Sequence, residues 1–394
     1  MTSHLVWTSG IDRSLSRIPV RGRDLAGRAG QTWWTPARLE RGLCQAGFGA
    51  EPARILGVSS MPRRVLSAAF AVAALLVSGC SAITGESSDP APSGPLEKSR
   101  INVAILPTVE IAPLQLAIRN GFFREEGLDV NVTIAGSGQQ TVEGMVNGQY
   151  DIVYSTYPPL ILAHSKRIAD VKIVAGNSYA APRTAMLMKR KDSPLNTAAD
   201  VAHKKVAVTA KGTLAELMVR SAIATQNVDH KSITFVEMPF PDMPTALNDG
   251  RADAAMMVEP FVTAAERSVG ASPLLDLASG PLNDLPFTGF GATGTFVNAN
   301  PKTVEAFQRG LARATDASSD RTKIEPLPEF AKIDKDVAAL TRLPVFRANL
   351  DPIPIQRIVK LMTDFGLLKE PVDVTPLLLK PPPARPRTTA TPQN

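Results

Sequence analysis

The 394-residue chain carries 43 Lys and Arg against 37 Asp and Glu, a formal net charge of +6. The excess lies in residues 1–79, which hold ten Arg and four acidic residues, while residues 80–394 hold 33 basic and 33 acidic residues. A neutral body lacks the basic surface that nucleic-acid binding needs, so no nucleic-acid partner is expected. The length allows two domains, since domains usually hold about 100 to 200 residues.

A short apolar run, residues 65–77, follows an Arg-Arg pair and precedes the ending Ser-Gly-Cys80. A positive head, a hydrophobic middle and small residues at the end are typical of a secretory signal peptide. A membrane-spanning helix needs about 20 apolar residues, so this run is too short to remain as an anchor. The ending resembles the bacterial lipobox, in which the Cys is lipidated. The alternative is a short buried helix that ends at an ordinary cysteine. The lipobox interpretation predicts an extracytoplasmic protein that is lipid-anchored to the cell membrane through Cys80.

The position of this signal divides the chain. A signal peptide acts from the N-terminus, so we interpret residues 1–60 as the product of a mis-set start, with translation beginning at Met61. A cytoplasmic extension is the alternative. Residues 61–79 are the predicted signal peptide, the Ser-, Pro- and Gly-rich residues 80–99 a flexible tether, and the Pro-rich residues 380–394 a disordered tail.

The cysteine and histidine contents limit the chemistry. The chain has two Cys, Cys80 and Cys44, and Cys44 lies in the doubtful segment 1–60. The folded part would then contain no thiol for a disulfide, a redox centre or a Cys-ligated metal. Four His are present without a pair at ligand spacing, so neither a metal nor a cofactor is expected.

Apolar runs of strand type alternate with helical patterns between residues 100 and 379. Strands are predicted at 101–106, 130–135, 151–155, 171–176, 184–189, 205–209, 233–238, 254–259 and 293–299. These runs are nearly continuous in apolar residues, which suits strands buried on both faces of a mostly parallel sheet. Helices are predicted at 112–120, 139–147, 242–248, 301–316, 327–340 and 352–365. The first three end at or just before Gly121, Gly148 and Gly250, as helices commonly do. The alternation indicates an α/β protein.

Three segments follow the lipobox-like sequence in order: 107–130 (PTVEIAPLQLAIRNGFFREEGLDV), 136–155 (GSGQQTVEGMVNGQYDIVYS) and 249–266 (DGRADAAMMVEPFVTAAE). Their order and spacing resemble the substrate-binding proteins of nitrate, sulfonate, taurine and thiamine-precursor ABC importers. The resemblance covers nearly all of residues 100–379. It implies the type II periplasmic-binding-protein fold, two α/β lobes with mostly parallel sheets joined by two hinge crossings, with the ligand between the lobes.

The resemblance also implies where the lobes divide. The first lobe would comprise 100–187 plus 293–379, and the second 188–290. The crossings would lie near 183–191 and 287–294.

The candidate ligand-binding residues lie in turns that follow predicted strands. Ligands of open α/β sheets bind beyond the C-terminal strand ends, where helix N-termini offer free N–H groups. The candidates are Thr108, Glu110 and Ile111; Ser137, Gly138 and Gln139; Tyr154, Ser155, Thr156 and Tyr157; Lys211, Gly212 and Thr213; and Glu259, Pro260 and Phe261.

Each of these turns also has a structural interpretation. Thr213 and Glu216 have capping-box spacing, so Thr213 could simply cap its helix. The glycine-rich turn could be only a turn. Glu259 could be a structural acid held by backbone N–H groups, Lys211 a solvated loop charge, and the two tyrosines core-edge aromatics.

The ligand and partners follow from the resemblance: a small solute, an ABC permease with its ATPase, and a monomeric receptor without catalytic activity. The solute would be small, polar and organic, of a sulfonate-, nitrate- or pyrimidine-precursor-like class. An oxyanion requires Arg or Lys donors, and Lys211 is the only such candidate, while Glu110 and Glu259 disfavour a bare anion. One alternative is a ligand-sensing lipoprotein without transport. Another is an enzyme of the thiamine-pyrimidine type, which relies on a Cys-rich iron-binding motif that this chain lacks.

Overall fold

The computed structural model describes residues 95–324, 329, 333–380 and 382, all within the unit Glu86–Asn394. The expected signal peptide, Cys80, residues 1–60, most of the tether and nearly all of the tail lie outside the described residues. Within the described ranges, no helix is both long and apolar enough to cross a membrane.

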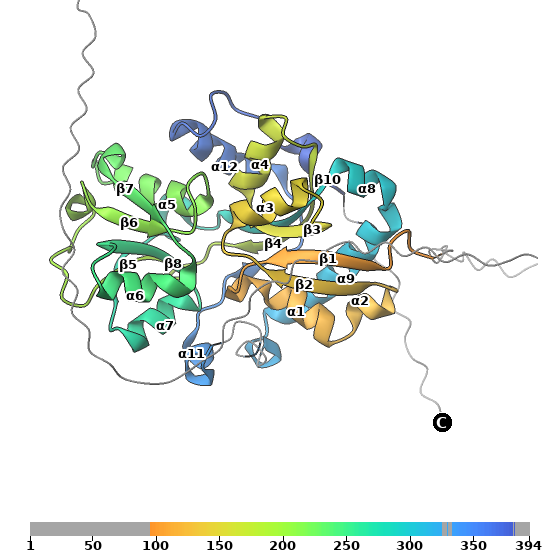
Figure 1. Ribbon diagram of the computed structural model, residues 1–394, viewed down its shortest axis with the longest axis horizontal. Helices are drawn as coiled ribbons and strands as arrows, with labels where there is room; N and C mark the ends of the chain where they lie inside the picture. Colours follow the sequence, from red (N-terminus) through yellow and green to blue (C-terminus); the bar gives the residue numbers. More distant parts are fainter. Residues whose placement is uncertain (1–94, 325–328, 330–332, 381, 383–394) are drawn as a thin grey trace, which may run out of the picture. The chain divides into compact units, whose positions relative to one another are not determined.

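The first of two sheets has six strands in the order β11-β4-β10-β3-β1-β2 (Figure 1). They are β1 (Arg100–Ile105), β2 (Asp129–Ile134), β3 (Ile152–Thr156), β4 (Val171–Tyr179), β10 (Pro286–Thr293) and β11 (Val345–Phe346). β1 is parallel to β2 and β3, whereas β10 is antiparallel to β3 and β4, and β11 is antiparallel to β4.

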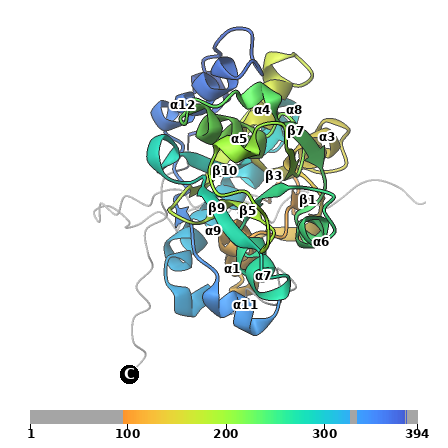
Figure 2. The same cartoon turned by 90° about the vertical axis from the view of Figure 1, so that its left-hand side faces the viewer.

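The second sheet has five strands in the order β7-β6-β8-β5-β9, seen from its own side in Figure 2. They are β5 (Ala185–Lys189), β6 (Lys205–Val208), β7 (Thr234–Glu237), β8 (Ala254–Val258) and β9 (Ser272–Asp276). β6 is parallel to β7 and β8, and β5 is antiparallel to β8 and β9. We call the elements of the first sheet the first lobe and those of β5–β9 the second lobe.

The α/β class and the two-lobed architecture are confirmed, but the sheets are mixed rather than mostly parallel. The antiparallel pairs all involve β5, β10 or β11. β5 and β10 are the first strands after the chain changes sheet, so they enter from the other lobe, against the direction of the βαβ strands beside them.

The chain passes from the first sheet to the second between Tyr179 and Ala185 and returns between Asp276 and Pro286. The expected crossings near 183–191 and 287–294 fall largely on β5 and β10, the strands that follow these passages. If each residue is assigned to the lobe whose sheet it joins, the boundaries between the lobes lie in the passages 180–184 and 277–285. Both passages precede the expected divisions at 187/188 and 290/293.

Helices cover both faces of each sheet. The helices are α1 (Ala112–Arg119), α2 (Phe122–Glu125), α3 (Gly138–Val146), α4 (Tyr157–Ser165), α5 (Leu214–Ala224), α6 (Met243–Asn248), α7 (Phe261–Ser268), α8 (Gly294–Ala299), α9 (Pro301–Ser318), α11 (Lys335–Leu340) and α12 (Pro352–Asp364). Short 3-10 helices are η1 (Val109–Ile111), η2 (Ala199–Val201), η3 (His230–Ser232), η4 (Phe240–Asp242), η5 (Gly280–Leu282), η6 (Arg321–Ile324) and η7 (Thr375–Leu377). Around the first sheet, α1, α2 and α9 form one layer and α3, α4 and α12 the other (Figure 1).

The apolar runs are buried as expected, and every residue of β8 is buried. In the first lobe a row of aromatic rings joins the helices to the sheet. Phe123 stacks on Phe307 with ring centroids 5.4 Å apart, Phe307 meets Phe290 at 5.3 Å, and Phe290 meets Tyr154 at 5.9 Å. Such pairs add to the free energy gained from burying apolar area. The row ends at Tyr154, so the core positions that side chain.

The sequence-based prediction was wrong around β10. Of the strand predicted at 293–299, residues 294–299 form helix α8, and Thr293, the last residue of β10, caps it by accepting a hydrogen bond from Phe296 N at 3.1 Å. Strand β10 immediately precedes this helix, and its glycines interrupt the apolar run from which a strand is predicted. A Cβ on Gly291 would lie 2.5 Å from Leu160 Cδ2, so only glycine fits under that side chain. Strands β9 and β11 were also missed.

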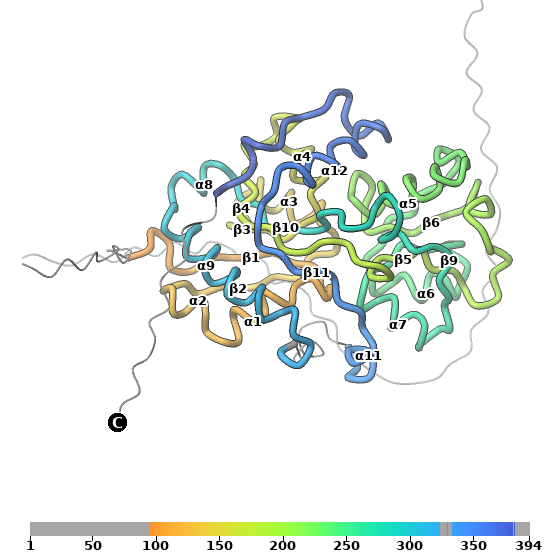
Figure 3. Tube along the Cα trace, turned by 180° about the vertical axis from the view of Figure 1, so that it is seen from behind, coloured from red at the N-terminus to blue at the C-terminus, as the bar shows by residue number. Residues whose placement is uncertain are grey.

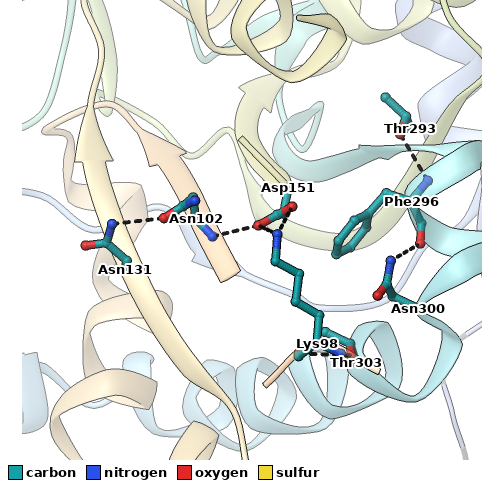
Figure 4. A network of polar contacts seen from close by, with 8 residues as sticks. All are labelled: Lys98, Asn102, Asn131, Asp151, Thr293, Phe296, Asn300 and Thr303. Carbon is teal, nitrogen blue, oxygen red and sulfur yellow. Dashed lines mark hydrogen bonds and ion pairs between the residues drawn. The ribbon is translucent and has the colours of Figure 1, made fainter. Parts of the chain in front are cut away.

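The N-terminal ends of β1 and β3 are tied together by a polar network (Figure 4). Lys98 Nζ lies 2.8 Å from Asp151 Oδ1, and Asp151 Oδ2 accepts a hydrogen bond from Asn102 N at 2.9 Å. Lys98 N also donates to Thr303 Oγ1 of α9 at 3.1 Å. This network lies at the N-terminal ends of the strands, whereas ligands of α/β sheets bind at the C-terminal ends.

The segment after α9 contacts both lobes. α11 contacts α7 of the second lobe, β11 pairs with β4, and α12 contacts both α4 and α5. Figure 3 shows this segment running from α11 past β11 towards α12. It therefore forms a third connection between the lobes, in addition to the two crossings.

Candidate functional site

A cavity of about 30 Å³ lies between the lobes, beyond the C-terminal ends of β1, β3, β6 and β8. This volume holds about two or three water molecules, since a water needs roughly 10–15 Å³ of such space. The lining residues are Leu106, Thr108, Glu110, Gly138, Tyr154, Thr156, Phe287 and Thr288 from the first lobe, and Thr209, Thr213, Ala215, Phe240, Met256 and Val258 from the second. Both lobes thus contribute residues to one small cavity.

The loop after β1 brings a carboxyl group to this cavity. Glu110 lies on η1, is 1% exposed, and its Oε2 has no hydrogen-bond partner among the described residues. A hydrogen bond from the first sheet fixes its backbone, because Asn177 Nδ2 on β4 donates to Glu110 O at 2.8 Å. The preceding residue is bound to the second lobe, because Val109 N donates to Glu259 O at 3.0 Å. Glu110 is thereby fixed in place by both lobes.

Burial changes the acidity of this site. It raises the pKa of Glu110 from 4.5 to about 7, although a hydrogen bond from Thr108 works in the opposite direction. The Thr108 hydroxyl also lies 3.0 Å from the Tyr154 hydroxyl. Burial, with a smaller contribution from the Glu110 charge, raises the Tyr154 pKa well above its usual range. Near neutral pH, therefore, Tyr154 is neutral and Glu110 is close to half ionised.

The glycine-rich turn serves mainly to build α3. Ser137 caps the helix by accepting a hydrogen bond from Gln140 N at 3.2 Å, and Gln139 is exposed. Gly138 lines the cavity, and a Cβ there would lie 2.7 Å from Ser155 Oγ. The Ser155 hydroxyl donates to Gly138 O at 3.1 Å, so this close approach joins α3 to β3.

The end of β3 contributes one more polar group. Thr156 lines the cavity, and its Oγ1 is buried without a hydrogen-bond partner among the described residues. Tyr157 is buried but does not line the cavity; its hydroxyl would lie 3.1 Å from a Cβ placed on Gly289. Ile111 is also buried away from the cavity.

The turn after β6 combines lining and capping roles. Thr213 lines the cavity, and its hydroxyl donates to Ala210 O at 2.7 Å rather than capping α5. Glu216 Oε2 accepts a hydrogen bond from Gly212 N at 2.8 Å, so the glutamate half of the capping box forms one residue early. Lys211 is exposed and lies outside the cavity wall, with its backbone N donating to Glu237.

The Glu259 turn lies behind the wall rather than in it. Glu259 is 0% exposed, and its carboxylate accepts hydrogen bonds from Thr263 Oγ1 at 3.0 Å and Thr263 N at 3.2 Å. Arg342 Nη1 lies 3.5 Å from Glu259 Oε1. Pro260 does not line the cavity either, and Phe261 stacks on Phe240, which does, at 5.4 Å.

Six of the sixteen candidates therefore line the cavity: Thr108, Glu110, Gly138, Tyr154, Thr156 and Thr213. Eight lining residues were not predicted: Leu106, Thr209, Ala215, Phe240, Met256, Val258, Phe287 and Thr288. Leu106 and Thr209 directly follow strands, so the strand-end rule could have included them. Phe287 and Thr288 lie on β10, which was not recognised as a strand.

The electrostatic character of the wall is simple. Of the fourteen described lining residues none is Arg, Lys or His, and Glu110 is the one carboxylic acid. Five threonines and one tyrosine provide hydroxyl groups, and the remaining side chains are apolar or absent. The described part of the chain contains no group of three or more His, Cys, Asp or Glu that could hold a metal ion. The wall can thus form hydrogen bonds and accept positive charge.

Comparison with known proteins supplies a family. Residues 94–333 match the model of the NMT1-like family. YtlA of Bacillus subtilis (strain 168), whose name calls it a binding protein, is 22% identical over 219 residues, which cover 55% of this chain and 65% of YtlA, just under two thirds.

Solved structures agree with the fold. The alkanesulfonate-binding protein SsuA of Xanthomonas axonopodis pv. citri, bound to MOPS, superposes with a TM-score of 0.61 at 18% identity, covering 72% of this chain and 98% of that protein. The periplasmic nitrate-binding protein NrtA of Synechocystis PCC 6803 gives a TM-score of 0.61 at 16% identity, with coverage of 70% and 83%.

Proposed function

Because the chain belongs to the NMT1-like family and has the fold of periplasmic solute-binding proteins, we propose that it captures a small organic solute between its lobes. The observation that carries the proposal is the cavity, whose wall is built from the strand ends of both lobes. A wall shared by two lobes opens when they separate and encloses its ligand when they close.

The site suits binding better than catalysis. Its polar groups are hydroxyls and one carboxyl, and the described wall pairs no nucleophile with a histidine or lysine base. The proposed ligand-binding residues are the six candidates on the wall together with Thr209, Phe240 and Thr288. The wall is divided between the two lobes, so hinge motion at the passages 180–184 and 277–285 would widen the cavity and admit a solute.

The cellular role extends this proposal. We infer an extracytoplasmic receptor, monomeric and anchored through lipid on Cys80, that delivers its solute to an ABC permease driven by an ATPase. The proposed solute belongs to one of three classes: sulfonates, nitrate or pyrimidine precursors. A sensor would bind its ligand in the same way, so uptake of labelled solute by cells with and without the gene separates transport from sensing.

Thermal-shift screening of the purified full chain against sulfonates, nitrate, pyrimidines and amines tests the binding function. A bound solute raises the melting temperature by mass action. Affinity for that solute is expected to fall in both Thr156→Val, from the first lobe, and Thr209→Val, from the second. Thr225→Val is the matched control, because Thr225 is exposed on the second lobe outside the cavity wall. Unchanged affinity in both cavity variants, or chemical turnover of the solute, would contradict the proposal.

The anchor has a separate test. Mass spectrometry of the protein isolated from its native membrane should find an acylated N-terminal peptide beginning at Cys80 and no peptide from residues 1–60. An unmodified Cys80 inside a longer peptide would refute it.

A further inference from the structure

Two unpaired oxygen atoms lie on the wall of the interlobe cavity. Glu110 Oε2 and Thr156 Oγ1 are both buried, and neither has a hydrogen-bond partner among the described residues. Buried polar atoms in folded proteins are nearly always paired. An ionised Glu110 can only accept hydrogen bonds, and the Thr156 hydroxyl can accept or donate. The two oxygens together therefore suit a ligand that carries hydrogen-bond donors.

The charges around the cavity disfavour an anion. Glu110 is the one carboxylic acid on the described wall, and none of the wall residues is basic. The nearby cation Arg342 already pairs with Glu259, and neither of these two residues lines the cavity. A sulfonate or nitrate would lie beside a buried carboxyl group without the guanidinium or ammonium donors that bind oxyanions.

Glu110 cannot easily withdraw from this position. Asn177 binds its carbonyl oxygen at 2.8 Å, and Val109 N is hydrogen-bonded to Glu259 O at 3.0 Å across the lobes. Closure of the lobes therefore brings the carboxyl group into contact with whatever the cavity holds.

The rest of the wall is suited to a carbon framework. Phe240, Met256 and Val258 of the second lobe, with Leu106 and Phe287 of the first, give the wall its apolar side chains. Phe240 is supported by its stacking on Phe261. A molecule that joins a donor group to a carbon framework matches both the polar and the apolar residues of the wall.

We propose that the ligand is a small organic cation, an amine or amidine whose N–H groups donate to Glu110 and Thr156 while its carbon atoms pack on the apolar side. This inference rests on the proposed function and narrows it from small solutes in general to cationic ones. It separates this receptor from the alkanesulfonate- and nitrate-binding proteins that share its fold.

The proposal has a pH signature. The titratable groups facing Glu110 are Glu259 and Tyr154, and burial raises the pKa of Glu110 to about 7. A bound cation favours the ionised carboxylate, so affinity should rise between pH 6 and pH 8 as the proton is lost. A bound anion would show the opposite trend.

The test uses probes matched in shape and opposite in charge: benzamidine with benzenesulfonate, and propylamine with propanesulfonate. Isothermal titration calorimetry on the full chain at pH 6 and pH 8 measures affinity for each probe. The amine or amidine of at least one pair should bind, more tightly at pH 8, and Glu110→Gln should weaken it by about tenfold or more. Thr156→Val should weaken it less. Glu370→Gln, at an exposed residue outside the cavity wall, should leave it unchanged.

The outcomes separate this inference from the function on which it rests. If a sulfonate or nitrate binds and loses affinity in Thr209→Val while the amines do not bind, the receptor function stands and the cation proposal is wrong. The cation proposal is also wrong if a cation binds equally well to the wild type, Glu110→Gln and Thr156→Val. If neither these probes nor the broader panel of solutes binds, both proposals fall together.

Discussion

Glu110→Gln in the ligand-free protein offers the most direct test of how the cavity is built. The substitution keeps the size of the side chain and its capacity to accept the Thr108 hydrogen bond, but removes the ionisable group. Glu110 has a pKa of about 7 in the folded protein against an ordinary value of 4.5. Between these two pH values the unfolded chain loses its proton first, so ionisation favours unfolding.

The sign and size of the effect follow from this difference. Because the folded pKa is raised, the stability that the protonated carboxyl contributes is fully present below pH 4.5 and is lost as pH rises through about 7. At 1.36 kcal/mol per pH unit, the loss amounts to at most about 3 kcal/mol. Glu110→Gln has no such loss. Part of the loss in the wild type has already occurred at pH 5, so the stability of the variant relative to the wild type should increase between pH 5 and pH 8 by up to about 2.5 kcal/mol.

Urea denaturation at pH 5 and pH 8 measures the free energy of unfolding of both proteins. Comparing the mutant-minus-wild-type difference at the two pH values cancels the titration of groups that the substitution leaves unchanged. Glu370→Gln is the matched control, because Glu370 is exposed and no pH-dependent difference is expected there. A difference for Glu110→Gln that stays constant, or that falls as pH rises, would show that the carboxyl is not a buried, uncompensated acid.

Two further substitutions test the surroundings of the site. Arg342→Ala removes the cation 3.5 Å from the buried Glu259 carboxyl group. Burial raises the pKa of Glu259 above its ordinary value of 4.5, so at pH 4 this carboxyl is protonated and little loss is expected. At pH 8 we expect a loss of about 1 kcal/mol, because Arg342 is partly exposed; urea denaturation at both pH values measures it. Gly310→Ala should lower stability by about 1–3 kcal/mol, despite the better helix propensity of Ala, because its Cβ would lie 2.5 Å from the Phe123 ring. Thermal unfolding measures this loss. An unchanged or higher melting temperature would show that the Phe123 ring can shift away from Phe307 at little cost in free energy.

Much of the fold could be predicted because burial on both faces leaves a strong signal in the sequence. Strand β8 is apolar at every position, and the glycines after α1, α3 and α6 all adopt positive φ. Strand β10 carried no such signal. Its glycines are required by tight packing against neighbours, such as Leu160, that lie far away in the sequence. The mixed strand directions had the same origin, since they depend on where the chain changes lobes.

The site was harder to predict than the fold. The strand-end rule led to turns that contribute to the cavity wall, but local hydrogen bonding decided which side chains reach the cavity. Ser137 caps α3, Ser155 holds α3 on β3, and Glu216 binds the backbone of its own turn. Phe240 reaches the wall from η4, which follows β7 in a turn that was not considered. Polar residues at strand ends are therefore divided between capping and lining roles that only the three-dimensional structure reveals.

Glu110→Gln is expected to raise the relative stability of the ligand-free protein at high pH and to lower its affinity for a cationic ligand. These opposite effects distinguish a ligand-binding carboxyl group from a structural one. Removing a structural acid such as Glu259, whose oxygens accept several hydrogen bonds, would leave its donors unpaired, with or without ligand. Removing Glu110, with its unpaired Oε2, should stabilise the empty protein at pH 8 and weaken the complex. A buried charge without a partner is unfavourable in the closed, ligand-free form, and a cationic ligand would supply the missing partner. The same group would then disfavour closure on an empty cavity and favour closure on the correct solute.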